Sequence, residues 1–194
     1  MSVPTIVFIR HGETDWNVEE RLQGQRDIPL NDRGRLQARR NGETVLAELP
    51  EAIGYDFVAS PLTRSRDTME IVRTAMGLDP KAYRLDDRLR ELTFGEWEGF
   101  TLAELSARYA DAVSARQKDK WGYLPPGGES YRLLSERVAG WLAELRAPTF
   151  AVAHGGVGRV LCGLLLGRPP EAVVSMEFPQ DRVLLIENGT GTWL

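Results

Sequence analysis

Short apolar runs alternate with longer amphipathic stretches along this 194-residue chain. Runs rich in β-branched and other apolar residues predict buried strands at 5–9, 56–60 and 149–153, and residues 82–86 are a further candidate strand. Apolar positions at helical spacing predict helices after residue 31 and after residue 60, and over residues 101–109, 131–145 and 157–166. Residues 183–187 and 192–194, joined through Asn188 and Gly189, predict a hairpin at a sheet edge.

The predicted helices carry start signals and apolar stripes. Asn31 and Asp32 offer a cap for the first helix, which ends before Pro50. Ser60 is expected to cap the second helix, with Pro61 at its first position, where a missing N–H costs nothing. The inward-facing residues are expected to be Ala38, Gly42, Val45, Leu46 and Leu49, then Leu62, Ser65, Met69, Val72 and Met76, then Leu102, Leu105 and Tyr109, and finally Tyr131, Leu134, Val138, Trp141, Leu142 and Leu145.

Strands that alternate with helices predict an α/β fold, a three-layer αβα arrangement with a largely parallel sheet and helices on both faces. The chain length fits a single domain over residues 1–194. Residues 111–128 are polar, then aromatic, then rich in proline and glycine, which is typical of a surface segment that covers a site. We therefore expect a small lid insertion over residues 101–130.

The overall composition argues against several classes of function. The 24 lysines and arginines against 28 aspartates and glutamates give a net charge of −4, which disfavours a nucleic-acid partner held by phosphate attraction. Cys162 is the single cysteine and cannot form an internal disulfide. The sequence shows neither a signal-peptide pattern nor a run of ~20 apolar residues, so we expect a cytoplasmic protein without a membrane partner. The sequence does not indicate an oligomeric state.

Candidate chemistry gathers where the predicted strands end. Arg10 and His11 follow the first strand, the stretch from Ser60 to Arg64 follows the second, and His154 follows the strand at 149–153. The chain contains only these two histidines, and a glycine comes directly after each. Because ligands in open α/β sheets bind at the carboxyl ends of the strands, three such segments predict one shared site.

The arginines of these segments suit a phosphate. Arg64 would lie in the first turn of a helix, whose free N–H groups favour an anion, and guanidinium forks match phosphate oxygens. The other reading of either arginine is an ordinary surface charge. A metal site made by His11 and His154 with Glu13 or Glu91 is a further alternative, although the spacing matches no known metal motif.

Five ordered motifs stand out along the chain. They are residues 10–17 (RHGETDWN), 21–30 (RLQGQRDIPL), 60–68 (SPLTRSRDT), 89–99 (LRELTFGEWEG) and 154–157 (HGGV). Together they resemble the motifs of the histidine phosphatase superfamily, also called the phosphoglycerate mutase-like family. The resemblance extends along essentially the whole chain, and five motifs in order are far more specific than RHG alone.

The resemblance implies a phosphotransfer site that needs no metal and no other cofactor. By analogy, His11 is the nucleophile that becomes a phosphohistidine, and Glu91 protonates the leaving oxygen and then activates water. His154 completes the catalytic set as a cationic or hydrogen-bonding clamp. The residues implied to bind the phosphoryl group are Arg10, Arg64, Asn17 and His154, and those implied to contact the substrate are Gln23, Gly24 and Gly155.

The insertion separates the hydrolase and mutase readings of the resemblance. Mutases that resemble this chain carry adjacent arginines in a longer insertion, whereas the corresponding region here offers Arg116, Lys118 and Lys120. Leu102 and Phe94 also stand where the mutase pattern has lysine and tyrosine. These departures disfavour phosphoglycerate mutase-type transfer.

Residues 126–130 (PGGES) instead resemble the phosphatase members, including the broad-specificity and α-ribazole types. In that branch Glu129 is a second candidate acid beside Glu91. The resemblance therefore implies a phosphomonoester hydrolase whose partner is a small phosphorylated metabolite. Phosphoglycerate mutase-type transfer and a non-catalytic phosphate-binding module are the alternatives.

Two unrelated motifs also occur near the C-terminal end. Cys162 and Arg168 have the Cys-x5-Arg spacing of cysteine phosphatases, but the residues between them belong to an apolar helix, which favours a buried core thiol. Gly156-Val157-Gly158 follows a strand as in a dinucleotide fingerprint, but the third glycine position is Leu161. Neither motif is expected to carry chemistry.

Overall fold

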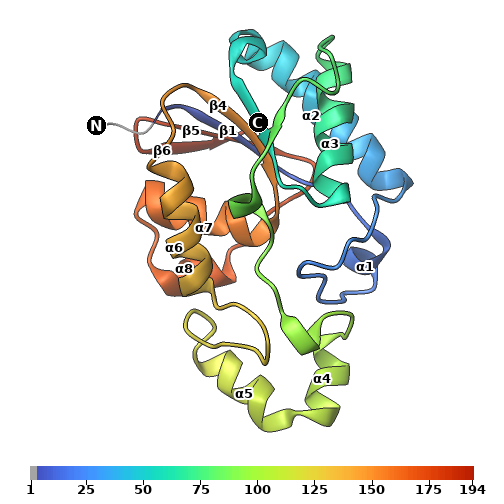
Figure 1. The fold of residues 1–194 in the computed structure, drawn as a ribbon, viewed down its shortest axis with the longest axis vertical. Coiled ribbons are helices and arrows are strands. Elements are labelled where there is room, and N and C mark those ends of the chain that lie inside the picture. Colours follow the sequence, from blue (N-terminus) through green and yellow to red (C-terminus); the bar gives the residue numbers. More distant parts are fainter. Residues whose placement is uncertain (1–3) are drawn as a thin grey trace.

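The computed structural model describes residues 4–194, whose six-stranded sheet has the order β3-β2-β4-β1-β5-β6 (Figure 1). The pairings of β1 with β4, β4 with β2 and β2 with β3 are parallel, and β5 and β6 run antiparallel at one edge. The strands are β1 (Ile6–Arg10), β2 (Asp56–Ala59), β3 (Arg84–Leu85), β4 (Thr149–Ala153), β5 (Val183–Glu187) and β6 (Thr190–Trp193). The predicted α/β class and mostly parallel sheet are confirmed.

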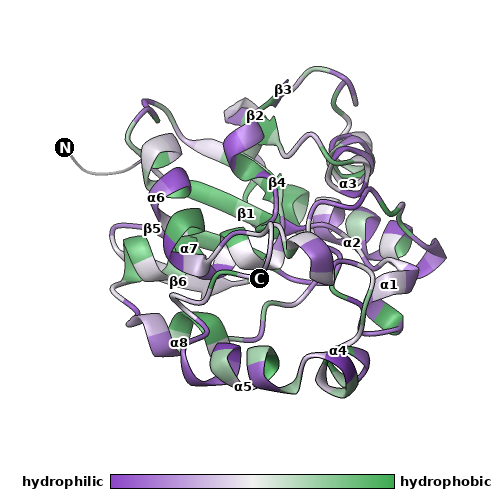
Figure 2. Cartoon of the chain, turned by 60° about the horizontal axis from the view of Figure 1, so that its bottom comes forward, coloured by the Kyte–Doolittle hydropathy of each residue, from purple (hydrophilic) through white to green (hydrophobic). Residues whose placement is uncertain are grey.

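Helices cover both faces of the sheet (Figure 1). On one face lie α2 (Asp32–Glu48) and α3 (Thr63–Ala75), and on the other lie α6 (Tyr131–Leu142) and α7 (Gly155–Leu166). In β1, Ile6 and Phe8 pack into the cluster that contains α6 and α7, while Val7 and Ile9 pack into the cluster that contains α2 and α3. This alternation follows from the period of two along a strand, so the apolar residues 6–9 of β1 are buried on both faces. Figure 2 shows β1 in the green of hydrophobic residues.

The predicted strands match the structure closely, apart from one. The hairpin of β5 and β6 turns at Asn188 and Gly189, both with positive φ, as predicted. The candidate strand at 82–86 shrinks to the two residues of β3. Both of its side chains are exposed, so this edge strand has no apolar face to bury.

The expected cap of α3 was wrong. The helix begins at Thr63 with Leu62 in the N-cap position, and Pro61 lies outside it. The Ser60 hydroxyl instead lies 2.8 Å from Nε2 of His154. A side chain that looks like a helix cap thus serves the site at the end of β4.

Three expected inward-facing residues are exposed: Leu46, Leu102 and Tyr109. Leu46 follows the buried Val45 and is therefore about 100° further round the helix axis. Helix α4 (Leu102–Arg108) buries Leu105 alone, and Tyr109 adopts a non-helical backbone after its end. The stripe of α6 was predicted correctly and is buried throughout.

Residues 101–130 extend beyond the layers of the fold at one end (Figure 1). They hold α4 and a second helix, α5 (Ala110–Lys118), which the sequence pattern did not predict. Val113 is the single buried residue of α5, so this helix has almost no apolar periodicity to read. Tyr123 stacks on Trp97 at 5.5 Å and Trp121 on Tyr131 at 6.4 Å between ring centroids, which ties the segment to the body.

The remaining elements are short. They are α1 (Asp15–Val18), α8 (Pro170–Ser175) and the 3₁₀ turns Pro50–Gly54, Asp87–Leu89 and Gly95–Trp97. Among residues 4–194, every helix is too short or too polar to cross a bilayer.

Candidate functional site

The carboxyl ends of β1, β2 and β4 bring His11, Ser60 and His154 together, because these strands are neighbours in the parallel part of the sheet. The two imidazole rings lie 5.2 Å apart between centroids, with an interplanar angle of 62°. Both histidines are buried. The structure therefore joins two residues that are separated by most of the chain.

His11 is held as a neutral ring with a defined proton position. Its Nδ1 lies 2.8 Å from the carbonyl oxygen of Gly12, which can only accept, so Nδ1 carries the proton and Nε2 carries the lone pair. Burial, followed by the charges of Arg64 and Arg10, lowers the pKa of His11 well below its usual value. A neutral imidazole with an unprotonated Nε2 is the form that can act as a nucleophile.

His154 has the complementary arrangement. Its Nε2 lies 2.8 Å from Oγ of Ser60 and 3.4 Å from Oγ of Ser65. The Ser60 hydroxyl accepts from the N–H of Leu62 and can donate its own proton to Nε2; in that tautomer Nδ1 carries the ring proton. This Nδ1 is buried and has no partner within residues 4–194. Burial, followed by the charge of Arg64, lowers the pKa of His154 and so favours its neutral form.

Arg64 is fully buried in the first turn of α3. Its Nη1 donates to the carbonyl of Arg26 at 2.7 Å and its Nη2 to the carbonyl of Gly24 at 2.8 Å. These bonds fix the guanidinium plane, while Nε stays buried without an acceptor in the described chain. Burial lowers the pKa of Arg64 to about 10, against the opposing charge of Glu91, so the group remains a cation at neutral pH.

Arg10 repeats this pattern at the end of β1. Its Nη1 donates to the carbonyl of Phe178 at 2.7 Å, and its Nε is again buried without an acceptor among residues 4–194. Burial and the charge of Arg159 lower the pKa of Arg10 to about 10. Two guanidinium groups and His154 thus present three unsatisfied buried N–H donors, an arrangement that costs free energy until an acceptor binds.

Glu91 is bound to the N-terminus of α7. Its Oε2 accepts from the N–H of Gly156 at 3.1 Å, and its Oε1 accepts from the N–H of Leu92 at 3.0 Å. A Cβ at position 156 would lie 2.2 Å from Oε1 of Glu91, so a side chain there would displace the Glu91 carboxylate. The second glycine after His154 therefore makes room for a carboxylate.

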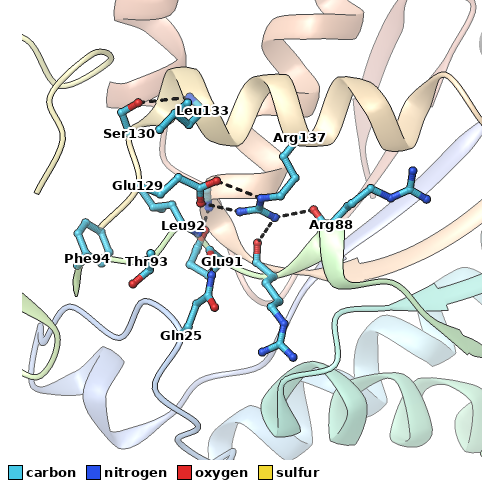
Figure 3. A network of polar contacts seen from close by, with 12 residues as sticks. Gln25, Arg88, Glu91, Leu92, Thr93, Phe94, Glu129, Ser130, Leu133 and Arg137 are labelled. Atoms are coloured by element: carbon cyan, nitrogen blue, oxygen red, sulfur yellow. Dashed lines mark hydrogen bonds and ion pairs between the residues drawn. The ribbon is translucent and has the colours of Figure 1, made fainter. Parts of the chain in front are cut away.

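Glu129 is held in an ion pair, as Figure 3 shows. Nη2 and Nε of Arg137 donate to its two oxygens at 2.7 and 3.1 Å. Nη1 of Arg137 also donates to the carbonyls of Arg88 and Arg90 at 2.7 and 3.0 Å, directly before Glu91. Arg137 thus links Glu129 to the turn that carries Glu91, a role that its place in an amphipathic helix did not reveal.

The other predicted site residues surround this centre. Asn17 uses Oδ1 to accept from the N–H of Thr14 at 3.1 Å and from Nε2 of Gln180 at 3.0 Å, which leaves its Nδ2 donors for a ligand. Gln23 is buried, and its Oε1 has no partner in the described chain. Gly24 has a φ of +50° and supplies a carbonyl to Arg64. The roles predicted for these residues stay predictions.

The structure also adds residues that sequence reasoning missed. The Thr68 hydroxyl accepts from the N–H of Gly12 at 3.1 Å, and Nε2 of Gln180 donates to the carbonyl of His11 at 3.2 Å. Both stabilise the turn that carries His11. Thr68 stands in a motif that had been recognised, whereas Gln180 lies in a loop without any pattern.

The structure also bears on the metal-site and cysteine-phosphatase alternatives. No three His, Cys, Asp or Glu side chains of residues 4–194 are grouped so that they could hold a metal ion. Cys162 is buried in α7, and burial raises the pKa of its thiol to about 11, which makes it unreactive near neutral pH.

Known proteins share this architecture. Residues 6–194 match the family described as histidine phosphatase superfamily (branch 1). The glucosyl-3-phosphoglycerate phosphatase of Mycobacterium tuberculosis is 36% identical over 182 residues, which cover 87% of this chain and 78% of that protein. The 2,3-bisphosphoglycerate-dependent phosphoglycerate mutase 2 of Gloeobacter violaceus is 31% identical over 179 residues, which cover 89% and 80%.

A solved structure extends the match to three dimensions. The alpha-ribazole phosphatase from Shigella flexneri superposes with a TM-score of 0.81 at 28% identity, over 97% of this chain and 93% of that one. The family match spans all five motifs and both histidines. This chain belongs to branch 1 of the histidine phosphatase superfamily.

Proposed function

We propose that this protein is a phosphomonoester hydrolase that acts on a small phosphorylated metabolite through a phosphohistidine at His11. The observation that carries the proposal is the set of three buried N–H donors without acceptors, on Arg10, Arg64 and His154, beside a neutral His11. A phosphoryl group supplies the acceptors that these donors lack. It also spreads negative charge over three oxygens in the transition state, where fixed cations stabilise it most.

The reaction proceeds in two steps. In the first, Nε2 of His11 attacks phosphorus, the P–O ester bond breaks, and Glu91 gives a proton to the leaving oxygen. In the second, water attacks the phosphohistidine, its proton passes to Glu91, and the N–P bond breaks to release inorganic phosphate. Arg10, Arg64 and His154 hold the phosphoryl oxygens throughout.

We assign the proton transfer to Glu91 and a positioning role to Glu129. Both oxygens of Glu129 are engaged by Arg137, so a proton transfer would break a bidentate ion pair. Glu91 instead accepts from the first turn of α7, the helix that follows His154. Its charge also acts on Arg10 and Arg64, which places it beside the proposed phosphate pocket.

Leaving-group dependence tests this assignment. Glu91→Gln should lower kcat/KM for an alkyl phosphate by about 100-fold, because an alkoxide needs a proton to leave. The loss in kcat/KM for 4-nitrophenyl phosphate should be much smaller, because 4-nitrophenolate leaves without a proton. Glu129→Gln should show the same leaving-group dependence with a smaller loss, since it disturbs the position of Glu91 and leaves its carboxyl group in place. Steady-state kinetics on the two esters measures this. A leaving-group-dependent loss in Glu129→Gln alone would reverse the two roles.

Hydrolysis and phosphoryl transfer to a second substrate hydroxyl share this chemistry, and relatives of both kinds exist. The insertion lacks an adjacent arginine pair, and Leu102 is exposed where the mutase pattern has a lysine. We therefore expect labelled 3-phosphoglycerate, given with its bisphosphate primer, to release inorganic phosphate. Chromatography measures both outcomes, and rapid isomer exchange without phosphate release would favour a mutase. Binding without either reaction would favour a non-catalytic module.

A further inference from the structure

Glu98 carries a largely enclosed carboxylate that takes no part in the proposed reaction. It directly follows the 3₁₀ turn Gly95–Trp97, and its side chain is only 8% exposed. Its Oε1 accepts three hydrogen bonds, from the N–H of Gln25 at 2.9 Å, the hydroxyl of Thr93 at 2.8 Å and the N–H of Phe94 at 3.1 Å. One oxygen therefore joins two segments that are far apart in the sequence.

Residues 24–26 all lie against this carboxylate. Gly24 has a φ of +50°, and a Cβ added there would overlap Oε1 of Glu98, so the backbone approaches the carboxylate closely. Oε2 of Glu98 lies 3.6 Å from Nε of Arg26. The Arg26 side chain is 65% exposed, and an ion pair with such a partner contributes little. The segment is therefore held mainly by the hydrogen bond from Gln25 to Oε1.

The peptide that joins Gly24 to Gln25 lies between Glu98 and Arg64. Its N–H donates to Oε1 of Glu98, and its carbonyl oxygen accepts from Nη2 of Arg64 at 2.8 Å. The carbonyl of Arg26 accepts from Nη1 of Arg64 at 2.7 Å. A peptide unit is planar and rigid, so a shift of the Glu98 oxygen moves an acceptor that orients the guanidinium plane. The Nε of Arg64, which is proposed to bind phosphate, turns with that plane.

The other two bonds of Oε1 hold the turn that carries Glu91. Thr93 and Phe94 follow Glu91 by two and three residues, and the Thr93 hydroxyl also accepts from the N–H of Gly95 at 3.0 Å. Nε2 of Gln25 donates to the carbonyl of Glu91 at 3.0 Å, and Figure 3 shows Gln25 close to Glu91. The proposed proton donor is therefore tied to the same segment that orients the arginine.

These contacts exceed what stabilisation of a turn requires. Local donors, such as those of Thr93 and Phe94, satisfy a carboxylate that only stabilises its own turn. The donor on Gln25 is 73 positions away along the chain. An enclosed carboxylate is also costly to desolvate, so its hydrogen bonds have to be well formed. A shift of Gln25 or of the turn is therefore opposed from both sides.

We propose that Glu98 is a positioning residue that holds the phosphate-binding Arg64 and the proton donor Glu91 in one fixed geometry. It acts on Arg64 through the peptide of residues 24 and 25, and on Glu91 through the turn of residues 91–94. The inference rests on the proposed function, since it concerns the arginine and the acid of that reaction. It adds that these two groups are positioned together.

Two esters with different leaving groups separate the two sides of Glu98. Glu98→Ala should lower kcat/KM for 4-nitrophenyl phosphate about tenfold, because Arg64 is displaced. For an alkyl phosphate the loss should be about 100-fold, because Glu91 is displaced as well. Glu98→Gln keeps an oxygen acceptor in place and should recover most of both losses. Equal losses for the two esters, or no recovery in Glu98→Gln, would contradict the proposal.

Glu96→Ala is the matched control, because Glu96 is exposed in the same 3₁₀ turn. It should leave kcat/KM for both esters unchanged. A leaving-group-dependent loss in the Glu96 variant would mean that any disturbance of the turn has this effect, and Glu98 would then have no special role.

Double variants show whether Glu98 acts through Arg64 and Glu91. In a Glu91→Gln background, Glu98→Ala should lower kcat/KM by the same factor of about ten for both esters, since only the effect on Arg64 remains. In an Arg64→Ala background, it should leave kcat/KM for 4-nitrophenyl phosphate unchanged. Losses that are fully additive in both backgrounds would show that Glu98 acts independently of the two groups, which would overturn the proposal.

Binding of inorganic phosphate keeps the test independent of turnover. In calorimetric titrations, Glu98→Ala should bind phosphate about tenfold more weakly than wild-type protein, and Glu98→Gln should bind it nearly as well. Thermal unfolding identifies the variants that fold. If Glu98→Ala does not fold, Glu98→Asp, which withdraws the same oxygens by one methylene group, takes its place. Absence of ester hydrolysis by wild-type protein would refute the proposed reaction alone, whereas an unchanged phosphate affinity in the folded variant would refute the role of Glu98.

Discussion

Replacing His11 with alanine is expected to lower phosphomonoesterase activity by about 10⁴-fold or more, because the variant lacks the atom that forms the covalent intermediate. Nε2 of His11 is the nitrogen left unprotonated by the bond from Nδ1 to Gly12. Arginines and water alone can stabilise charge but cannot form a phosphoenzyme. The loss should therefore appear in kcat for every ester, whatever its leaving group.

Trapping of the intermediate gives the direct measurement. Wild-type protein mixed with a ³²P-labelled ester and quenched in alkali should retain label, since a phosphohistidine survives alkali and decays in acid, and His11→Ala should retain none. His154→Ala is the matched control, because that ring also lies in the site yet is proposed only to donate a hydrogen bond. Label that persists in the His11→Ala protein, or full turnover by that variant, would contradict a covalent intermediate on His11.

The burial of the site explains why its histidines and arginines behave in opposite ways. Burial lowers the pKa of both kinds of side chain. For a histidine this removes the charge at neutral pH and yields a nucleophile. For an arginine, a pKa of about 10 still leaves the cation in place. One low-dielectric pocket therefore contains both a neutral imidazole and charged guanidinium groups.

Much of the fold could be predicted because its core strands have a simple pattern. The apolar run of β1 and the stripe of α6 are set by burial alone, and both were predicted correctly. Helix α5 was missed because Val113 is its only buried residue. An element that binds through polar or charged side chains leaves no hydrophobic period to detect.

The site residues divide in the same way. Arg10, His11 and His154 could be placed because each ends or directly follows an apolar strand, and parallel strands bring their ends together. Arg137 could not, since it lies on a helix and binds the Glu129 carboxylate together with the carbonyls of Arg88 and Arg90. Contacts to carbonyls depend on the path of the chain and leave no mark in the side-chain pattern. The prediction that Ser60 caps α3 was wrong for a related reason. A serine hydroxyl can hydrogen-bond a helix N-terminus or an imidazole equally well, and here it contacts Nε2 of His154.

Replacing Arg64 with alanine is expected to lower kcat/KM by about 10²–10³-fold, the cost of removing one donor that stabilises developing negative charge. The Nε of Arg64 is buried without an acceptor, and its other nitrogens are fixed by the carbonyls of Gly24 and Arg26. Arg64→Lys should recover little of the loss, because an ammonium cannot hold both carbonyls and a phosphate oxygen in one plane.

Folding effects have to be separated from this loss, since Arg64→Ala also frees the loop at residues 24–26. Thermal unfolding of each variant measures the change in stability, and Arg66→Ala, an exposed arginine one half-turn further along α3, is the matched control that should keep both activity and stability. Inorganic phosphate should bind wild-type protein more tightly than Arg64→Ala in calorimetric titrations, because the variant has lost a cation and a donor. If a folded Arg64→Ala protein kept its kcat/KM and its affinity for phosphate, the anion would have to bind at some other place than the ends of β1, β2 and β4.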